Sequence, residues 1–122
     1  GFRPTVEDMY AGYTVIENKF TGNTTIGIVM TNACFDKSRL CKIAGMAQNG
    51  VARSIHPVHT SADGDSVYAM SVGTVQADMD MVGTLAADVM SEAILSAVKN
   101  AETAYGYISA SDFLCCSGVN VA

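Results

Sequence analysis

The residue of this sequence best placed to do chemistry is Thr24, which stands where a polar segment meets an apolar run. Gly22 and Asn23 end the polar segment, and the β-branched residues that follow predict a buried strand over residues 24–32. A hydroxyl at the start of a strand is held rigidly and still reaches a substrate. Two interpretations stay open: a buried strand with a polar end, or a nucleophile uncovered by cleavage of the Asn23–Thr24 bond. Spacing alone favours the first.

A threonine hydroxyl is a poor nucleophile unless a base stands beside it. If Thr24 becomes a chain terminus, its own α-amine can take the hydroxyl proton, because an α-amine titrates at about 7.7–8.0. The same hydroxyl could first attack the Asn23 carbonyl and form an ester that water opens. Self-cleavage and later amide hydrolysis would then share one nucleophile.

A second candidate is the acidic pair Asp63 and Asp65, separated by Gly64. If these residues enter the strand that follows, their spacing points both carboxylates to one side. Such a pair could orient a terminal amine, fix a nucleophile or share a proton. On the residues alone, a solvated Asp-Gly turn is the favoured interpretation.

His56 and His59 are three residues apart, a spacing that suits a metal site only on a helix. Pro57 lies between them and argues against a helix there. With no evident third ligand, a structural role is favoured and no metal or other cofactor is expected. Met79 and Met81 are expected to fill the core near the start of a helix.

Four cysteines, Cys34, Cys41, Cys115 and Cys116, match no zinc-binding spacing. Free buried thiols in a reducing cytoplasm are the favoured interpretation, and a disulfide between the two regions is the lesser alternative.

Composition bounds the class of protein. The chain has 122 residues, of which 49% are hydrophobic and 16% charged, with a formal net charge of −5. One domain is expected, and the apolar surplus fits a piece that packs against more protein. The first residue is Gly1, which fits a fragment or a processed product. No basic cluster suggests nucleic-acid binding, and no apolar run is expected to reach membrane-spanning length.

Periodicity predicts the order strand, helix, strand, helix. Residues 1–12 are expected to be irregular, residues 12–17 to form a short strand and residues 18–23 a loop. A helix is predicted over 37–54, capped by Asp36 and stopped by Pro57, with its apolar residues on one face. Gly27, inside the first strand, suggests a place where another backbone or a ligand comes close.

The second half of the chain is predicted in the same way. Residues 56–65 form a loop, and residues 66–72 a strand that ends at Gly73. A long helix is predicted over 78–104, with an apolar stripe at Val82, Ala86, Val89, Ala93, Ala97 and Ala101. The tail from Tyr105 is expected to add an edge strand or to be poorly ordered.

Four segments together carry a resemblance to a known family. They are GNTTIGIVMTNA, QNGVARSIHPVHT, DGDSVYAMSVG and ADVMSEAILSAV, in order from about Gly22 to Val98. These motifs closely resemble the DmpA-like aminopeptidases, which include β-peptidyl aminopeptidases and the nylon-oligomer hydrolase NylC. Residues 1–21 and the tail after Ala104 lie outside the resemblance.

The resemblance implies an α/β chain that forms the C-terminal portion of a four-layer αββα sandwich. Members are made as a precursor that cuts itself before a serine or threonine, which then serves as the N-terminal nucleophile. The scissile pair falls on Asn23 and Thr24, and the acidic pair of the NylC-like branch falls on Asp63 and Asp65. Residues 1–23 are then the segment before the cut, and residues 24–122 belong to the nucleophile-bearing chain.

The resemblance also implies what is missing. Family precursors are two to three times as long, so the chain looks like the C-terminal third. An asparagine of the oxyanion hole and a tyrosine near the substrate would lie in the upstream part, and little activity is expected without them. The implied partners are that N-terminal portion, further copies of the protein, and a small peptide or amide substrate.

Two alternative functions stay open. One is an acyltransferase of the ornithine acetyltransferase type, although the motifs here differ from its cleavage signature. The other is a family member that has lost catalysis and serves as an assembly module. The Asn23–Thr24 start of the strand, together with Asp63 and Asp65, favours a self-processing amide hydrolase over both.

Overall fold

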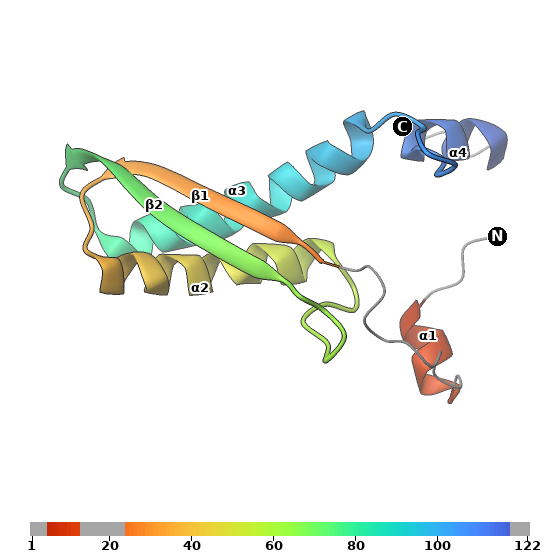
Figure 1. Ribbon diagram of the computed structural model, residues 1–122, viewed down its shortest axis with the longest axis horizontal. Coiled ribbons are helices and arrows are strands. Elements are labelled where there is room, and N and C mark those ends of the chain that lie inside the picture. The colour runs from red at the N-terminus through yellow and green to blue at the C-terminus, as the bar shows by residue number, and fades with distance from the viewer. Residues whose placement is uncertain (1–4, 13–23, 118–122) are drawn as a thin grey trace.

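The computed structural model describes residues 5–12 and 24–117, and Figure 1 shows two strands lying along a pair of long helices. The strands are β1 (Ile26–Ala33) and β2 (Ser66–Val75). The long helices are α2 (Lys37–Ser54) and α3 (Met79–Asn100), and the short ones are α1 (Thr5–Tyr10) and α4 (Ala110–Ser117). The predicted order strand, helix, strand, helix is therefore confirmed for β1, α2, β2 and α3.

The two strands pair in parallel, and α2 connects them. The register sets Ile26 opposite Ser66 and Met30 opposite Met70, and it shifts once after Thr31. A parallel pair needs such a crossover, because the second strand must start from the same end as the first.

Strand β2 does not end at Gly73, as the sequence suggested, but continues to Val75. A Cβ atom at Gly73 would lie 2.1 Å from the carbonyl oxygen of Asn32. The glycine therefore allows a close approach of the two backbones near the register shift, and does not terminate the strand.

Helix α2 has the predicted bounds. The Asp36 side chain accepts a hydrogen bond from the Arg39 backbone N–H at 2.8 Å, which satisfies one of the free donors at the helix start. Ile43, Ala47 and Val51 are buried on its predicted apolar face. These three residues form the core together with Ala33 of β1 and residues of α3.

Helices α2 and α3 pack closely because glycines lie where they meet. A Cβ atom at Gly50 would lie 2.2 Å from the Ala87 carbonyl oxygen, and one at Gly83 would lie 2.3 Å from the sulfur of Met46. Gly50 is thus a packing residue as well as a weak point in the helix. The predicted stripe of α3 is partly wrong: Ala86 is buried, but Val89 is exposed, and Met90 packs inward in its place.

Met90 also explains the glycine in β1. A Cβ atom at Gly27 would lie 2.8 Å from the terminal methyl of Met90, so a side chain comes close at this position rather than the predicted backbone or ligand. Of the two methionines near the start of α3, Met79 packs against the core as predicted. Met81 is exposed, so its predicted core role is wrong within this chain.

The ends of the chain differ from the sequence predictions. Helix α3 stops at Asn100 rather than residue 104, and residues 5–10 are helical rather than irregular. The tail forms α4 instead of an edge strand, after an isolated bridge between Ala104 and Tyr107. Residues 13–23, which hold most of the predicted short strand and loop, lie outside the described residues.

Helix α3 is long and apolar enough to cross a membrane by length and composition alone, so the expectation that no segment would qualify is wrong. Two acidic residues, Asp88 and Glu92, nevertheless lie in the middle of the helix. Asp88 forms an ion pair with Arg53 of α2, and Ser91 hydrogen-bonds Ser54 of α2 at 2.7 Å. These contacts, with the core residues, describe a helix packed against protein on one side.

One face of the sheet is uncovered in this chain. Alternate residues of β1 and β2 point away from the helices, and six large side chains there are 46–70% exposed. We call this the open sheet face: Ile26, Ile28, Met30, Tyr68, Met70 and Val72. Parallel sheets are almost always covered on both faces, and exposed apolar surfaces of this kind are typical of interaction sites.

The four cysteines are free, as the sequence suggested, but they are exposed rather than buried. Cys41 lies on the outer side of α2, since the inward positions of that helix are taken by Ile43 and Ala47. Cys115 and Cys116 lie in α4, whose eight residues contribute nothing to the main core cluster.

Candidate active site

The candidate site lies where the two strands begin. Thr24 and Thr25 come directly before β1, and residues 63–65 come directly before β2. Because the strands are parallel, these two segments meet at the same end of the sheet. The Ser66 backbone N–H donates to the Thr25 carbonyl oxygen at 2.9 Å and extends the ladder by one bond beyond β1.

Asp65 joins the two segments. Its Oδ1 accepts a hydrogen bond from the Thr25 backbone N–H at 2.9 Å, and its Oδ2 lies 3.1 Å from Nδ1 of His59. The side chain is only 7% exposed, so each oxygen needs a donor to offset its removal from water. Thr25 is therefore held on both sides, at its N–H by Asp65 and at its carbonyl by Ser66.

Thr24 stays accessible at the edge of this arrangement. Its side chain is exposed, and a Cβ atom placed on Gly64 would lie 2.8 Å from its Oγ1. The Thr24 hydroxyl therefore lies directly beside the bare Cα of Gly64. A rigid backbone on one side and open space on the other suits a hydroxyl that must meet a substrate.

Asp63 plays a different part from Asp65. Its Oδ2 accepts from the Thr60 backbone N–H at 2.6 Å, and its own N–H donates to the Thr60 carbonyl at 3.1 Å. Hydrogen bonds from the Thr60 hydroxyl and then its backbone N–H lower the pKa of Asp63, and the nearby charge of His59 adds to this effect. Asp63 thus closes the loop that carries His59.

The structure brings together some of the predicted residues and separates others. Asp65 contacts the residue next to Thr24, so a purely solvated Asp-Gly turn is the wrong interpretation for it. Asp63 and Asp65 precede β2 instead of entering it, and their carboxylates bind different partners. Asn23 lies outside the described residues.

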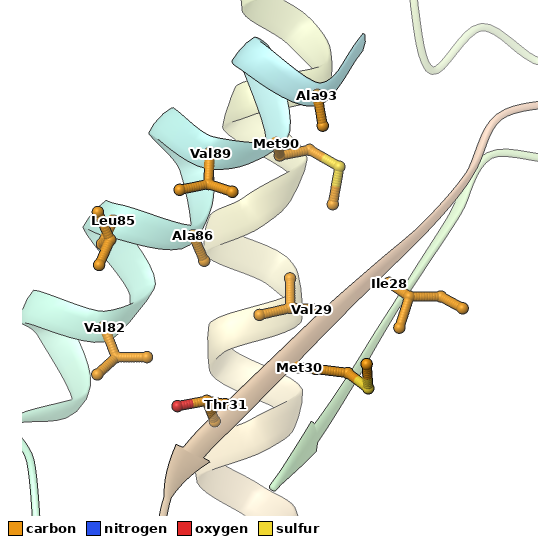
Figure 2. Close-up of a pocket in the computed structure, with 10 residues that line it drawn as sticks. All are labelled: Ile28, Val29, Met30, Thr31, Val82, Leu85, Ala86, Val89, Met90 and Ala93. Carbon is orange, nitrogen blue, oxygen red and sulfur yellow. The ribbon is translucent and has the colours of Figure 1, made fainter. Parts of the chain in front are cut away.

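A separate apolar groove of about 200 Å³ lies between β1 and α3. Figure 2 shows Val29 and Thr31 pointing toward α3, while Ile28 and Met30 point from the opposite side of β1. Leu85 and Val89 form its outer wall on α3 and are exposed. The groove holds one polar side chain, Thr31, and none of Thr24, Asp63 or Asp65, so it suits packing rather than chemistry.

Within residues 5–12 and 24–117, no three or more His, Cys, Asp or Glu side chains gather as they would around a metal ion. His59 instead contacts the carboxylate of Asp65. What this arrangement of side chains offers is a fixed backbone, an exposed hydroxyl and two carboxylates, which are groups that nucleophilic hydrolysis can use.

Comparison with known protein families identifies the family of this chain. The model of peptidase family S58 matches residues 4–110, which is most of the chain. The chain belongs to peptidase family S58. This confirms the resemblance to the DmpA-like aminopeptidases drawn from the sequence motifs.

The relatives of this S58 chain are longer proteins. An uncharacterized aminopeptidase of Mycobacterium leprae is 34% identical over 120 residues, 85% of this chain and 33% of the relative. One of Mycobacterium tuberculosis is 34% identical over 99 residues, 69% of this chain and 29% of the relative. A 6-aminohexanoate-oligomer endohydrolase of a Kocuria strain is 30% identical over 91 residues, 64% and 26% respectively. The chain thus spans between about a quarter and a third of the length of these relatives.

Two features of the candidate site are not predicted by the sequence. Gly64 was considered only as a turn residue, although the glycine is what admits the Thr24 hydroxyl. His59 was weighed as a metal ligand or a structural residue, and its contact with Asp65 was not foreseen. The position of His59 six residues before an aspartate carries no signal by itself, because the loop between them sets their distance.

Proposed function

We propose that this chain is the nucleophile-bearing part of a self-processing amide hydrolase, with the cut between Asn23 and Thr24. The observation that carries the proposal is the held backbone of Thr25. Asp65 and Ser66 fix that residue, and the hydroxyl of its neighbour Thr24 remains exposed beside Gly64. Membership in a peptidase family supplies the reaction class.

Self-cleavage begins when Oγ1 of Thr24 attacks the carbonyl carbon of Asn23. The hydroxyl proton passes to the Thr24 nitrogen as the C–N bond breaks, which leaves an ester between Asn23 and the Thr24 side chain. Water then opens the ester, releasing the Asn23 carboxyl group and restoring the hydroxyl. The new α-amine lies on the same residue as the nucleophile.

Hydrolysis of a substrate repeats the chemistry. The α-amine of Thr24 takes the hydroxyl proton, Oγ1 attacks the substrate carbonyl, and the amine returns the proton to the departing nitrogen. The acyl group left on Oγ1 is removed by a water molecule that the same amine activates. An amine titrating near neutral pH suits both steps, since it gains and loses a proton with equal ease.

The two aspartates have separate tasks in this scheme. Asp65 holds the Thr25 N–H, which fixes the residue that follows the nucleophile. Asp63 anchors the loop through Thr60.

We further propose that the upstream part of the same precursor completes the enzyme. The chain spans about a third of its relatives, and the open sheet face offers six large apolar side chains for a second sheet. Such a contact would give the four-layer αββα sandwich. The groups of the oxyanion hole would come from that part, so the isolated chain should have little activity.

The substrate class proposed is small peptides or amides. Relatives named aminopeptidases and 6-aminohexanoate-oligomer endohydrolases support cleavage of an unhindered amide bond. Four exposed free cysteines favour a reducing compartment such as the cytoplasm. Further copies of the protein could share the remaining apolar surface of α3, where Leu85 and Val89 are exposed.

The proposal is tested in the complete precursor with two variants. Thr24→Ala removes the hydroxyl, and Thr84→Ala makes the same change at an exposed threonine on α3. Hydrolysis of amino-acid anilides and of 6-aminohexanoate oligomers should be lost in Thr24→Ala and kept in Thr84→Ala. Normal hydrolysis by Thr24→Ala would overturn the nucleophile assignment, and an inactive, uncut parent protein would favour an assembly module.

A further inference from the structure

The contact between His59 and Asp65 has no part in the scheme above. Oδ1 of Asp65 accepts from the Thr25 N–H at 2.9 Å, and Oδ2 lies 3.1 Å from His59 Nδ1. The two oxygens are therefore held by two different segments of the chain. A carboxylate can only accept, so the contact is favourable when the imidazole carries a proton toward it.

The second contact is what gives the carboxylate a fixed plane. The terminal torsion of an aspartate is broad, so a carboxylate held at one oxygen can still turn about its Cβ–Cγ bond. A partner at each oxygen, the Thr25 N–H at Oδ1 and the His59 ring at Oδ2, limits that freedom. With the plane of Asp65 fixed, its Oδ1 offers the Thr25 N–H one defined acceptor position. The orientation of the peptide unit that links Thr24 to Thr25 is fixed as a result.

We propose that His59 is a positioning residue that acts on Thr24 through Asp65 and Thr25. The proposal rests on the proposed function, because it assumes that Thr24 is the nucleophile. His59 touches neither substrate nor reacting atoms. Its contribution is to keep the hydroxyl of Thr24 within the narrow range of positions from which it attacks a carbonyl carbon.

The charges around His59 fit this task. Its own loop presents two carboxylates, Asp65 in direct contact and Asp63 close enough to feel its charge. On the strand side lie Thr24 and Thr25, whose side chains do not ionise near neutral pH. No lysine or arginine among residues 5–12 and 24–117 forms an ion pair with either carboxylate. In this part of the chain, His59 is the ionisable side chain that forms an ion-pair contact with Asp65.

The backbone of His59 determines which substitutions are informative. Its φ is 57°, a left-handed conformation that asparagine and glycine adopt more readily than most residues. His59→Asn keeps an N–H donor close to the position of Nδ1. His59→Gly removes the donor and leaves the backbone unstrained. The two variants therefore differ mainly in the contact with Asp65.

The experiment measures self-cleavage by intact mass, together with kcat and KM, in the complete precursor. His59→Gly should slow cleavage and lower kcat about 10–100-fold with KM little changed, because a displacement of about 1 Å costs on the order of 10²-fold. His59→Asn should recover most of the loss. If His59→Gly fails to fold, His59→Asp is used in its place. Aspartate has the shape of asparagine but its charge repels Asp65, so His59→Asp should cleave and turn over more slowly than His59→Asn.

A double-variant cycle separates positioning from general weakening of the fold. Asp65→Asn alone should be slow, and adding His59→Gly should cause no further loss, since the path through Asp65 is already broken. Parental cleavage and kcat in His59→Gly would overturn the proposal, as would equal losses in His59→Asn and His59→Gly.

The failure of this proposal is distinguishable from failure of the proposed function. If Thr24→Ala cleaves and hydrolyses normally, Thr24 is not the nucleophile and both proposals fall. If Thr24→Ala is inactive while His59→Gly matches the parent, the nucleophile stands and only the positioning role of His59 is refuted.

Discussion

Replacing Gly64 with alanine should impair the reaction while sparing the fold. The new Cβ would lie 2.8 Å from Oγ1 of Thr24, whereas ordinary contact begins at 3.4 Å. The hydroxyl must therefore move by about 0.6 Å. If a misplacement of about 1 Å costs on the order of 10²-fold, this smaller shift should slow self-cleavage and lower kcat by about tenfold.

The same change should leave stability almost untouched. Gly64 is exposed, and its φ lies outside the positive region, so alanine fits the backbone. Only the end of an exposed threonine side chain has to move. Alanine also lowers the conformational entropy of the unfolded chain, which stabilises the folded protein by about 0.4–1 kcal/mol. The melting temperature should be unchanged or slightly higher.

The assay compares Gly64→Ala with Gly45→Ala in the complete precursor. A Cβ at Gly45 meets nothing within 4 Å, so that variant controls for the substitution itself. Cleavage is followed by intact mass, turnover with a small amide substrate, and folding by thermal denaturation. Parental rates in Gly64→Ala would show that the position of the Thr24 hydroxyl does not limit the reaction.

Three further outcomes follow from the packing and the charges. Gly50→Ala should destabilise the protein by about 1–3 kcal/mol, because its Cβ would lie 2.2 Å from a backbone oxygen of α3. Gly45→Ala on the same helix should stabilise the protein by about 0.5–1 kcal/mol, since nothing lies within 4 Å of its Cβ. Equal melting temperatures of the two variants would contradict this expectation. The pKa of Asp63 is lowered from 3.8, so its contribution to stability is present above that pH and is lost as the pH falls through the lowered value. Asp63→Asn should therefore flatten the acid side of the plot of stability against pH. An unchanged slope in that variant would be evidence against this contribution. Met30→Glu places a charge on the open sheet face, where Met30 is exposed in the isolated chain. The variant should raise the solubility of the isolated chain but reduce the yield of folded precursor. A normal precursor yield would argue that this face stays open.

Much of the fold was predictable because local signals agreed with the tertiary structure. Asp36 and Pro57 bracket α2, so its bounds matched the prediction. The end of α3 was overestimated because residues 101–104 remain apolar or helix-compatible, and nothing in the sequence says that packing stops at Asn100. Helix α4 had a detectable start that was overlooked: the Ser109 hydroxyl accepts from the Asp112 N–H at 3.1 Å, as a capping serine does.

The candidate site was predictable in part. A hydroxyl at the start of a strand and an acidic pair before the next strand can be recognised from residue order, and parallel pairing then brings them to one end of the sheet. The separate roles of Asp63 and Asp65 could not be predicted, because they depend on how the loop folds around Thr60. The contact of Gly64 with Thr24 depends on the same loop.

The most direct test of the central claim is the intact mass of the complete precursor after purification and incubation. Two chains should be found, and the second should begin at Thr24, with Thr24→Ala leaving a single uncut chain. A precursor that remains whole, or that is cut at another bond while hydrolysing its substrate, would contradict the account.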